Sequence, residues 1–255
     1  MPGPVQVDVT AAVNQLASEL GVKVGPRLLD AAIGAINDTA AAVQKAQVHE
    51  MRDVFDRPTP YTLSSVYMQR AARGRPQAKV GLKDFSGKGI AASQFLAAQI
   101  TGGERRLKRF EKALRAVAKL PEDYIAVPGA GAQLDAYGNI KPSQIVQILS
   151  YFKAFPEAGY RANMTDKRRK RLAKGGRGKE HQGFRYFVGR PGGRGALGVW
   201  QASTYIRGAI KPVLLFVPSA QYEATFDFAF VAENTVQKTY RSAFEARARL
   251  VGVGR

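Results

Sequence analysis

The chain carries few of the side chains that enzymes most often use for chemistry. It contains no cysteine and only two histidines, His49 and His181, which are far apart in the sequence. Without a thiol there is no disulfide, no cysteine nucleophile and no soft metal ligand, so a zinc site built from nitrogen and sulfur ligands has almost no basis. No Gly-x-Ser-x-Gly turn accompanies either histidine. Both histidines are therefore interpreted as surface or interface residues.

Neither the glycine-rich segments nor the acidic residues form a motif for catalysis or for a cofactor. Residues 128–133 match only the first half of a dinucleotide-binding fingerprint, and residues 189–195 lack the Gly-Lys-Ser/Thr of a phosphate loop. The second segment is predicted to be a hairpin loop. The acids are scattered rather than clustered for a divalent cation, and Asp227 is predicted to cap the last helix. The sequence thus predicts a protein that is not an enzyme and that uses neither a cofactor nor a metal.

Positive charge is the strongest signal in the composition. The chain has 39 Lys and Arg against 20 Asp and Glu, a formal net charge of +19, and a pI near 10.3. Such an excess repels itself in a compact molecule, so an external anion is expected to offset it. Nucleic-acid phosphate is the first candidate and an acidic protein surface is the second. A generic basic surface that aids solubility is the remaining interpretation.

Much of this charge lies in one segment, residues 164–182, which we call the basic block. Eight basic residues crowd into positions 167–179, with three glycines and no acid among them. They are Lys167, Arg168, Arg169, Lys170, Arg171, Lys174, Arg177 and Lys179. Such a block repels itself and lacks apolar anchors, so it is predicted to be a mobile arm that contacts phosphate or an acidic surface. A merely solvated loop is the alternative. Arg73, Arg75, Arg190 and Arg194 form secondary basic loops.

Hydrophobic periodicity predicts a mixture of helices and strands. The predicted helices cover Thr10–Leu20, Arg27–Phe55, Ile90–Ile100, Glu104–Leu120, Ser143–Phe155 and Phe226–Leu250. The predicted strands lie within Tyr61–Ala72, Gln77–Lys83, Tyr124–Val127, Phe184–Val188, Leu197–Gln201 and Val213–Val217. The fold class is therefore α+β, with long N-terminal helices, a small antiparallel sheet with a hairpin, and a C-terminal amphipathic helix packed on the sheet. We expect one domain over residues 1–255, with a flexible basic insertion at about 164–182.

The hydropathy of the chain predicts no membrane contact. No stretch approaches the roughly 20 apolar residues that a spanning helix needs. The segment Met1–Val9 lacks the basic-then-apolar order of a signal peptide. The protein is therefore expected to stay in the compartment where it is made.

Several separated segments together resemble the phage minor tail protein Z-like family. The first two are the long helix 29–52, with Ile-Asn-Asp-Thr-Ala at 36–40, and the passage Arg-Pro-Thr-Pro-Tyr-Thr at 57–62. The stretch 137–150 is the most recognisable, and Gly-Val-Trp at 198–200, residues 210–218, Tyr222 and Phe226-Asp227 complete the pattern. The matching segments span roughly residues 28–250. Their order and joint occurrence carry the resemblance.

The resemblance implies a structural virion protein of a tailed bacteriophage, of the neck or tail-completion kind. Such a protein is assembled in the host cytoplasm and lies at the head–tail junction or in the tail. A homo-oligomeric ring around the DNA channel is implied, with a hexamer as a candidate copy number, and with portal, adaptor and tail proteins as partners. The family brings no catalytic residues. Because the basic block exceeds the family pattern, two assignments stay open for it: DNA in the channel, or an acidic neighbouring protein.

Two other hypotheses compete with this one. A non-viral basic nucleic-acid-binding protein, such as a nucleoid-like or ribosome-associated factor, explains the charge equally well but not the ordered set of segments. An enzyme that acts on polyanions is the third hypothesis, and the sequence offers no site for it.

Overall fold

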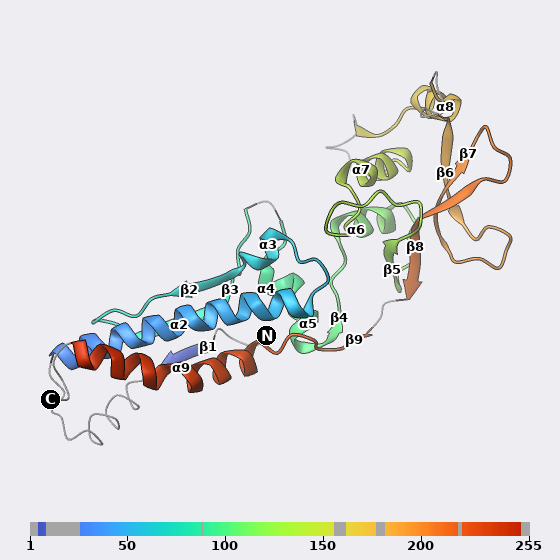
Figure 1. Cartoon of the computed structure of the whole chain (residues 1–255). Helices are drawn as coiled ribbons and strands as arrows, with labels where there is room; N and C mark the ends of the chain where they lie inside the picture. The colour runs from blue at the N-terminus through green and yellow to red at the C-terminus, as the bar shows by residue number, and fades with distance from the viewer. Residues whose placement is uncertain are drawn as a thin grey trace. The chain divides into compact units, whose positions relative to one another are not determined.

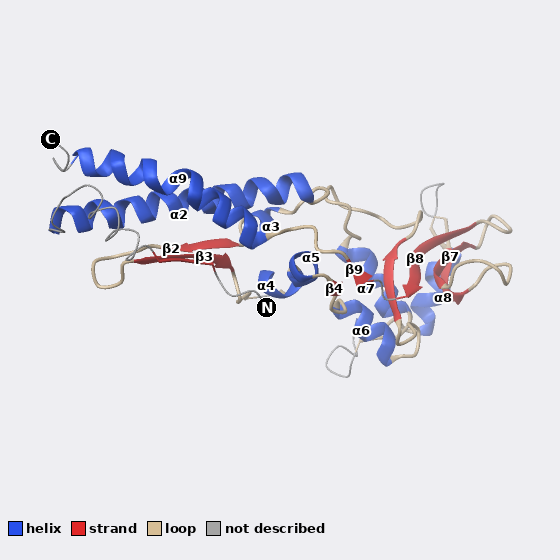
Figure 2. Cartoon of the chain, turned by 90° about the horizontal axis from the view of Figure 1, so that it is seen from below, coloured by secondary structure: helices blue, strands red, loops and turns tan. Residues whose placement is uncertain are grey.

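The computed structural model describes residues 5–8, 26–87, 89–155, 162–176, 182–218 and 221–250. The predicted α+β class is confirmed (Figures 1 and 2). Where the sequence predicted one domain, the chain divides into two compact units: unit 1 comprises Met1–Gly103 and Tyr222–Arg255, and unit 2 comprises Glu104–Gln221. The division follows from packing, because the buried apolar residues form two separate cores. The chain passes between the units where the short strands β4 (Gly103–Glu104) and β9 (Gln221–Tyr222) pair.

Unit 1 is built around two long antiparallel helices, α2 (Pro26–Val54) and α9 (Phe228–Leu250), which run side by side (Figures 1 and 2). Arg247 donates two hydrogen bonds to Asp38, at 2.6 and 2.8 Å, and Gln47 Nε2 donates to the carbonyl of Phe228 at 2.7 Å. Gly34 makes room for this pairing, since a Cβ there would lie 2.6 Å from Arg247 Cδ. The predicted cap is confirmed, because the N–H of Phe230 donates to Asp227 Oδ1 at 2.9 Å.

A three-stranded antiparallel sheet covers another side of α2. Its order is β1 (Val5–Asp8), β3 (Gln77–Leu82), β2 (Val66–Gln69). The short helices α3 (Pro60–Leu63), α4 (Ala92–Phe95) and α5 (Ala97–Thr101) complete the unit. The core joins all of these layers and includes Val43, Met51, Val80, Phe226 and Phe244. The C-terminal helix therefore packs chiefly on α2, and it also contacts the sheet through β1.

Unit 2 combines a four-stranded antiparallel sheet with three helices. The sheet order is β5 (Tyr124–Pro128), β8 (Ile210–Pro218), β7 (Gly198–Ser203), β6 (Phe184–Gly189). The helices are α6 (Arg109–Ala116), α7 (Pro142–Tyr151) and α8 (Asp166–Lys174). The second core joins α6 and α7 to the sheet through Leu114, Ile148, Tyr186, Val213 and Phe216. Gly189 is the last residue of β6, and residues 190–195 lie in the loop that joins it to its paired strand β7, so the predicted hairpin is confirmed.

Several predicted elements differ from the observed ones for local reasons. The predicted strand Tyr61–Ala72 begins as a helical turn because the side chain of Thr59 accepts a hydrogen bond from the N–H of Thr62 at 3.1 Å. The predicted helix Glu104–Leu120 is shorter, since Glu104 belongs to β4. The predicted helix Ile90–Ile100 divides into α4 and α5. The predicted helix Thr10–Leu20 lies outside the described residues.

Gly198 and Gly189, which are opposite each other in β7 and β6, provide a matched test of packing in this sheet. A Cβ at position 198 would overlap the backbone carbonyl of Leu214, whereas one at position 189 would lie 3.7 Å from the ring of Phe187, an ordinary contact. We expect Gly198→Ala to lower the free energy of unfolding by about 1–3 kcal/mol. Gly189→Ala should change it far less. Urea unfolding followed by the fluorescence of Trp200 measures both, and equal losses for the two variants would contradict this account.

Candidate nucleic-acid interface

The positive charge is concentrated in unit 2. Residues 104–221 contain 23 Lys and Arg against 8 Asp and Glu, a net charge of +15. The rest of the chain contains 16 Lys and Arg against 12 Asp and Glu, a net charge of +4. Unit 2 is therefore the part of the chain where a polyanion is expected to bind.

The basic block is in large part a helix rather than the predicted mobile arm. Six of its eight basic residues lie in α8: Lys167, Arg168, Arg169, Lys170, Arg171 and Lys174. Arg177 and Lys179 lie outside the described residues. Thr165 caps the helix by accepting a hydrogen bond from the N–H of Arg168 at 3.3 Å, and Asp166 places a negative charge in the first turn. Gly175, with φ +68°, ends it.

Tertiary contacts hold both ends of α8. At the C-terminal end, Thr204 Oγ1 donates to the carbonyl of Ala173, and the Tyr205 hydroxyl donates to the carbonyl of Lys174, both at 2.6 Å. Nearer the N-terminus, the guanidinium of Arg169 lies 4.7 Å from the ring centroid of Tyr151 and donates to the carbonyl of the same residue. These anchors compensate for the self-repulsion on which the prediction of mobility rested. Arg169 is thus committed to packing, and it is removed from the predicted contact residues.

Four of the remaining cations form what we call the basic face: Lys167, Lys170, Arg171 and Lys174. Their spacing of three, one and three residues places them on one side of the helix. All four are exposed, and none has a carboxylate partner within the described part of the chain. Like charges three and four residues apart repel each other, so an anion bound along this face would relieve the repulsion. Arg168 lies beside the face and, with Arg171, lines a groove of about 760 Å³ between α7 and α8.

The secondary basic loops are divided between the two units. Arg73 donates two hydrogen bonds to Asp30, at 2.7 and 2.5 Å, which hold the pKa of Asp30 below its usual value. Arg75 donates to the carbonyl of Arg70 at 2.8 Å, and both arginines belong to unit 1. Arg190 donates to the carbonyl of Gly195 at 3.3 Å, while Arg194 is exposed in the same loop of unit 2. Only Arg190 and Arg194 therefore share a unit with α8.

Sequence reasoning missed the most important charged residue of unit 2, Glu111. Its side chain is fully buried and accepts two hydrogen bonds from Arg105, at 2.9 and 2.6 Å. The N–H groups of Lys108 and Ala126 donate to it at 2.6 and 2.8 Å. Burial alone would raise the pKa of Glu111, but these hydrogen bonds outweigh it and hold the pKa below its usual value. The available signal was a single acid among the basic residues of 105–115, three positions after Lys108, which is the spacing of a capping box.

No catalytic group emerges from the described residues. His49 is exposed on α2, with its Nδ1 2.8 Å from Asp53, and His181 lies outside the described residues. Among the residues that are described, no cluster of His, Cys, Asp and Glu could hold a metal ion. Within the same ranges, no helix combines the length and the apolar character that crossing a membrane requires.

The chain has no recognisable match. Comparison with protein-family models, with curated proteins and with solved structures found nothing similar. The site is therefore interpreted from its own geometry.

Replacing Glu111 by Gln should destabilise unit 2. The change leaves Arg105 without its buried counter-charge, and we expect a loss of about 3 kcal/mol in the free energy of unfolding at pH 7. Because the folded pKa lies below the ordinary value of 4.5, the contribution of Glu111 is complete above that pH and declines as the pH falls through the folded pKa. The difference between wild type and variant should therefore narrow in acid. Urea titrations between pH 7 and pH 3 test this, with the exposed Glu122→Gln as control. A difference independent of pH would argue against the assignment.

Neutralising the basic face should reduce the salt sensitivity of DNA binding. The variant changes Lys167, Lys170, Arg171 and Lys174 to Gln. If all four contact phosphate, the slope of log K against log salt should fall by up to about 3.6. Fluorescence anisotropy with a labelled duplex over a salt series measures the slope. The control removes four exposed cations of unit 1, Lys45, Lys83, Lys238 and Arg249, at the same cost in net charge. Equal slopes for the two variants would mean that net charge, not the face, governs binding.

Proposed function

We propose that this chain is a structural virion protein of a tailed bacteriophage that acts at the head–tail junction, without catalytic activity. In this role it forms a homo-oligomeric ring around the DNA channel and contacts portal, adaptor and tail proteins. The ordered resemblance of its segments to the phage minor tail protein Z-like family supports the proposal. The observation that carries it is the basic face of α8, four exposed cations with no carboxylate partner among the described residues, on a folded unit with a net charge of +15.

The basic face suits DNA that has to pass through a channel. Lysine and arginine neutralise phosphate without reading base sequence, so the contact is the same at every position along the duplex. In a ring of identical subunits each face is repeated by the symmetry, and the repulsion between copies grows with their number. Phosphate within the ring relieves this repulsion. Assembly of the ring and the presence of DNA therefore favour each other.

The composition of the face favours phosphate over the alternative of an acidic neighbouring protein. Three of the four cations are lysines, Lys167, Lys170 and Lys174. An ammonium group is a point charge that accepts many geometries, whereas the planar fork of arginine binds carboxylate or phosphate in a fixed geometry. Contacts with a mobile polyanion need charge but not fixed geometry. The basic face is accordingly assigned to DNA.

A non-viral nucleic-acid-binding protein is the second candidate, because the same face would serve it equally well. The two functions differ in what the protein assembles with. The virion role requires a closed oligomer and incorporation into particles, whereas a nucleoid-like or ribosome-associated factor requires only nucleic acid.

Electron microscopy of phage particles that lack this reading frame tests the proposal. We expect filled heads separated from tails, or joined particles that fail to deliver DNA, because the junction is incomplete. Supplying the wild-type protein in trans should restore infectious particles, and supplying the variant with four Gln on the basic face should restore joined particles with impaired delivery. Normal, infectious particles without the protein would overturn the virion role and leave the second candidate.

A further inference from the structure

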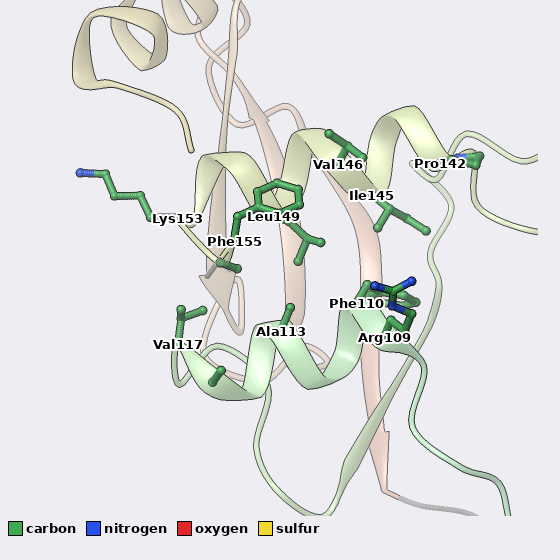
Figure 3. A pocket seen from close by; sticks show the side chains of 12 residues that line it. Arg109, Phe110, Ala113, Val117, Pro142, Ile145, Val146, Leu149, Lys153 and Phe155 are labelled. Atoms are coloured by element: carbon green, nitrogen blue, oxygen red, sulfur yellow. The ribbon is translucent and has the colours of Figure 1, made fainter. Parts of the chain in front are cut away.

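An apolar groove on unit 2 has no role in the proposed function. It lies between α6 and α7, has a volume of about 850 Å³, and is lined mainly by apolar side chains (Figure 3). Ile145 and Leu149 of α7 point toward Ala113 and Val117 of α6, with open space between them. All of the lining residues belong to unit 2 and are described by the structure.

The two helices carry a wider apolar stripe than the core of unit 2 uses. On α6 the core takes Leu114, which is fully buried, while Phe110 and Val117, the residue after the helix, pack against the core and remain partly exposed. On α7 the core takes Ile148 and Leu149, while Ile145 is partly exposed and Val146 is 50% exposed. Ala113, in the middle of the groove, is too small to close the gap between the helices. A contiguous apolar surface of this kind on a strongly charged unit is typical of a binding site.

The charged residues of the groove are all positive. Arg109 and Lys153 lie at its opposite ends, and no acid lines it (Figure 3). Lys153 Nζ also lies 3.8 Å from Asp166 Oδ1 in an exposed pair, with which an acidic ligand would compete. Lys112, which is exposed on α6, adds a further cation to the same helix. A complementary occupant therefore has an apolar face and acidic flanks.

We propose that this groove binds an acidic amphipathic helix of another protein. A groove between two packed helices accepts a third helix through apolar anchors at positions i, i+3 or i+4, and i+7. Acidic residues next to these anchors would reach Arg109 and Lys153. This groove adjoins the one that Arg171 lines, because Val146 lines both, and the inference does not rest on the virion role.

A second copy of this chain does not fit the groove as well. Helix α8 has six basic residues and one acid, and α9 has four against two, so both would meet the cations of the groove with like charge. Helix α2 is close to neutral, but its apolar face is already buried against α9 and the sheet. Charge complementarity therefore selects a foreign acidic helix.

A designed peptide serves as the probe for this site. It is a labelled, end-blocked helical peptide of about four turns, with Leu at the anchor positions and Glu at the flanking positions. We expect saturable binding to the full chain in fluorescence anisotropy. Two comparison peptides, a scrambled one of the same composition and one with Lys in place of Glu, should bind about tenfold more weakly or worse.

Variants of the full chain locate the binding. Ala113→Glu places a carboxylate in the apolar floor and should weaken binding of the acidic peptide about tenfold or more. The double variant Arg109→Gln with Lys153→Gln keeps the floor and should weaken binding severalfold while lowering its salt dependence. The controls are Ala130→Glu, an exposed alanine outside the groove, and Arg190→Gln with Arg194→Gln, which remove the same charge elsewhere on unit 2. Circular dichroism checks folding, and the double variant tests the site even if Ala113→Glu does not fold.

Three results would overturn the proposal. The acidic peptide could fail to bind, or the scrambled peptide could bind equally well, which would mean that the groove does not recognise an amphipathic helix. Alternatively, the wild type could self-associate in sedimentation while Ala113→Glu stays monomeric, which would make a second copy the occupant. None of these outcomes bears on the phenotype of particles that lack the protein.

Discussion

Mutual repulsion between cations is the constraint on which the arrangement of unit 2 depends. A net charge of +15 has to be held around one modest core, and self-repulsion of this size opposes compaction. The structure meets it by keeping most of the described cations in water and by giving partners to some that are partly buried. Arg105 is paired with the buried Glu111, and Arg169 lies over the ring of Tyr151. The carboxylate of Glu111 also joins the start of α6 to β5 through the N–H of Ala126.

The charged side chains of unit 1 are arranged differently. Several of its arginines have carboxylate partners on the surface, as in Arg73 with Asp30, Arg247 with Asp38 and Arg241 with Glu245. Exposed pairs of this kind contribute little to stability, about 0–1 kcal/mol each, so the apolar contact between α2, α9 and the sheet has to hold the unit together. Unit 1 is therefore closer to electrostatic balance, with a net charge of +4 against +15 for unit 2.

The parts of the fold that follow from local patterns could be predicted from the sequence. The periodicity of α2 and α9, the cap at Asp227 and the hairpin of β6 and β7 all depend on neighbouring residues. The ordered helical structure of α8 could not be predicted in this way. It depends on Thr204 and Tyr205, about 31 residues away, as well as on the nearby cap at Thr165. The basic block is visible in the sequence, but the contact that sets Arg169 apart from the other basic residues depends on the position of Tyr151. Likewise, the periodicity of a segment does not show which other segments share its hydrophobic core. The sequence therefore predicted one domain where the structure has two units.

The connectivity of the two units sets the order in which the protein can be built. Unit 2 is inserted within unit 1, between β4 and β9, and α9 is the last described element of the chain. During synthesis on the ribosome, α2 therefore cannot pack against α9 until every residue of unit 2 has been synthesised. During that interval the apolar side of α2 that α9 later covers remains exposed to solvent or to chaperones, while unit 2 already has all of its strands and helices. Unit 1 can thus be completed only after α9 has been synthesised.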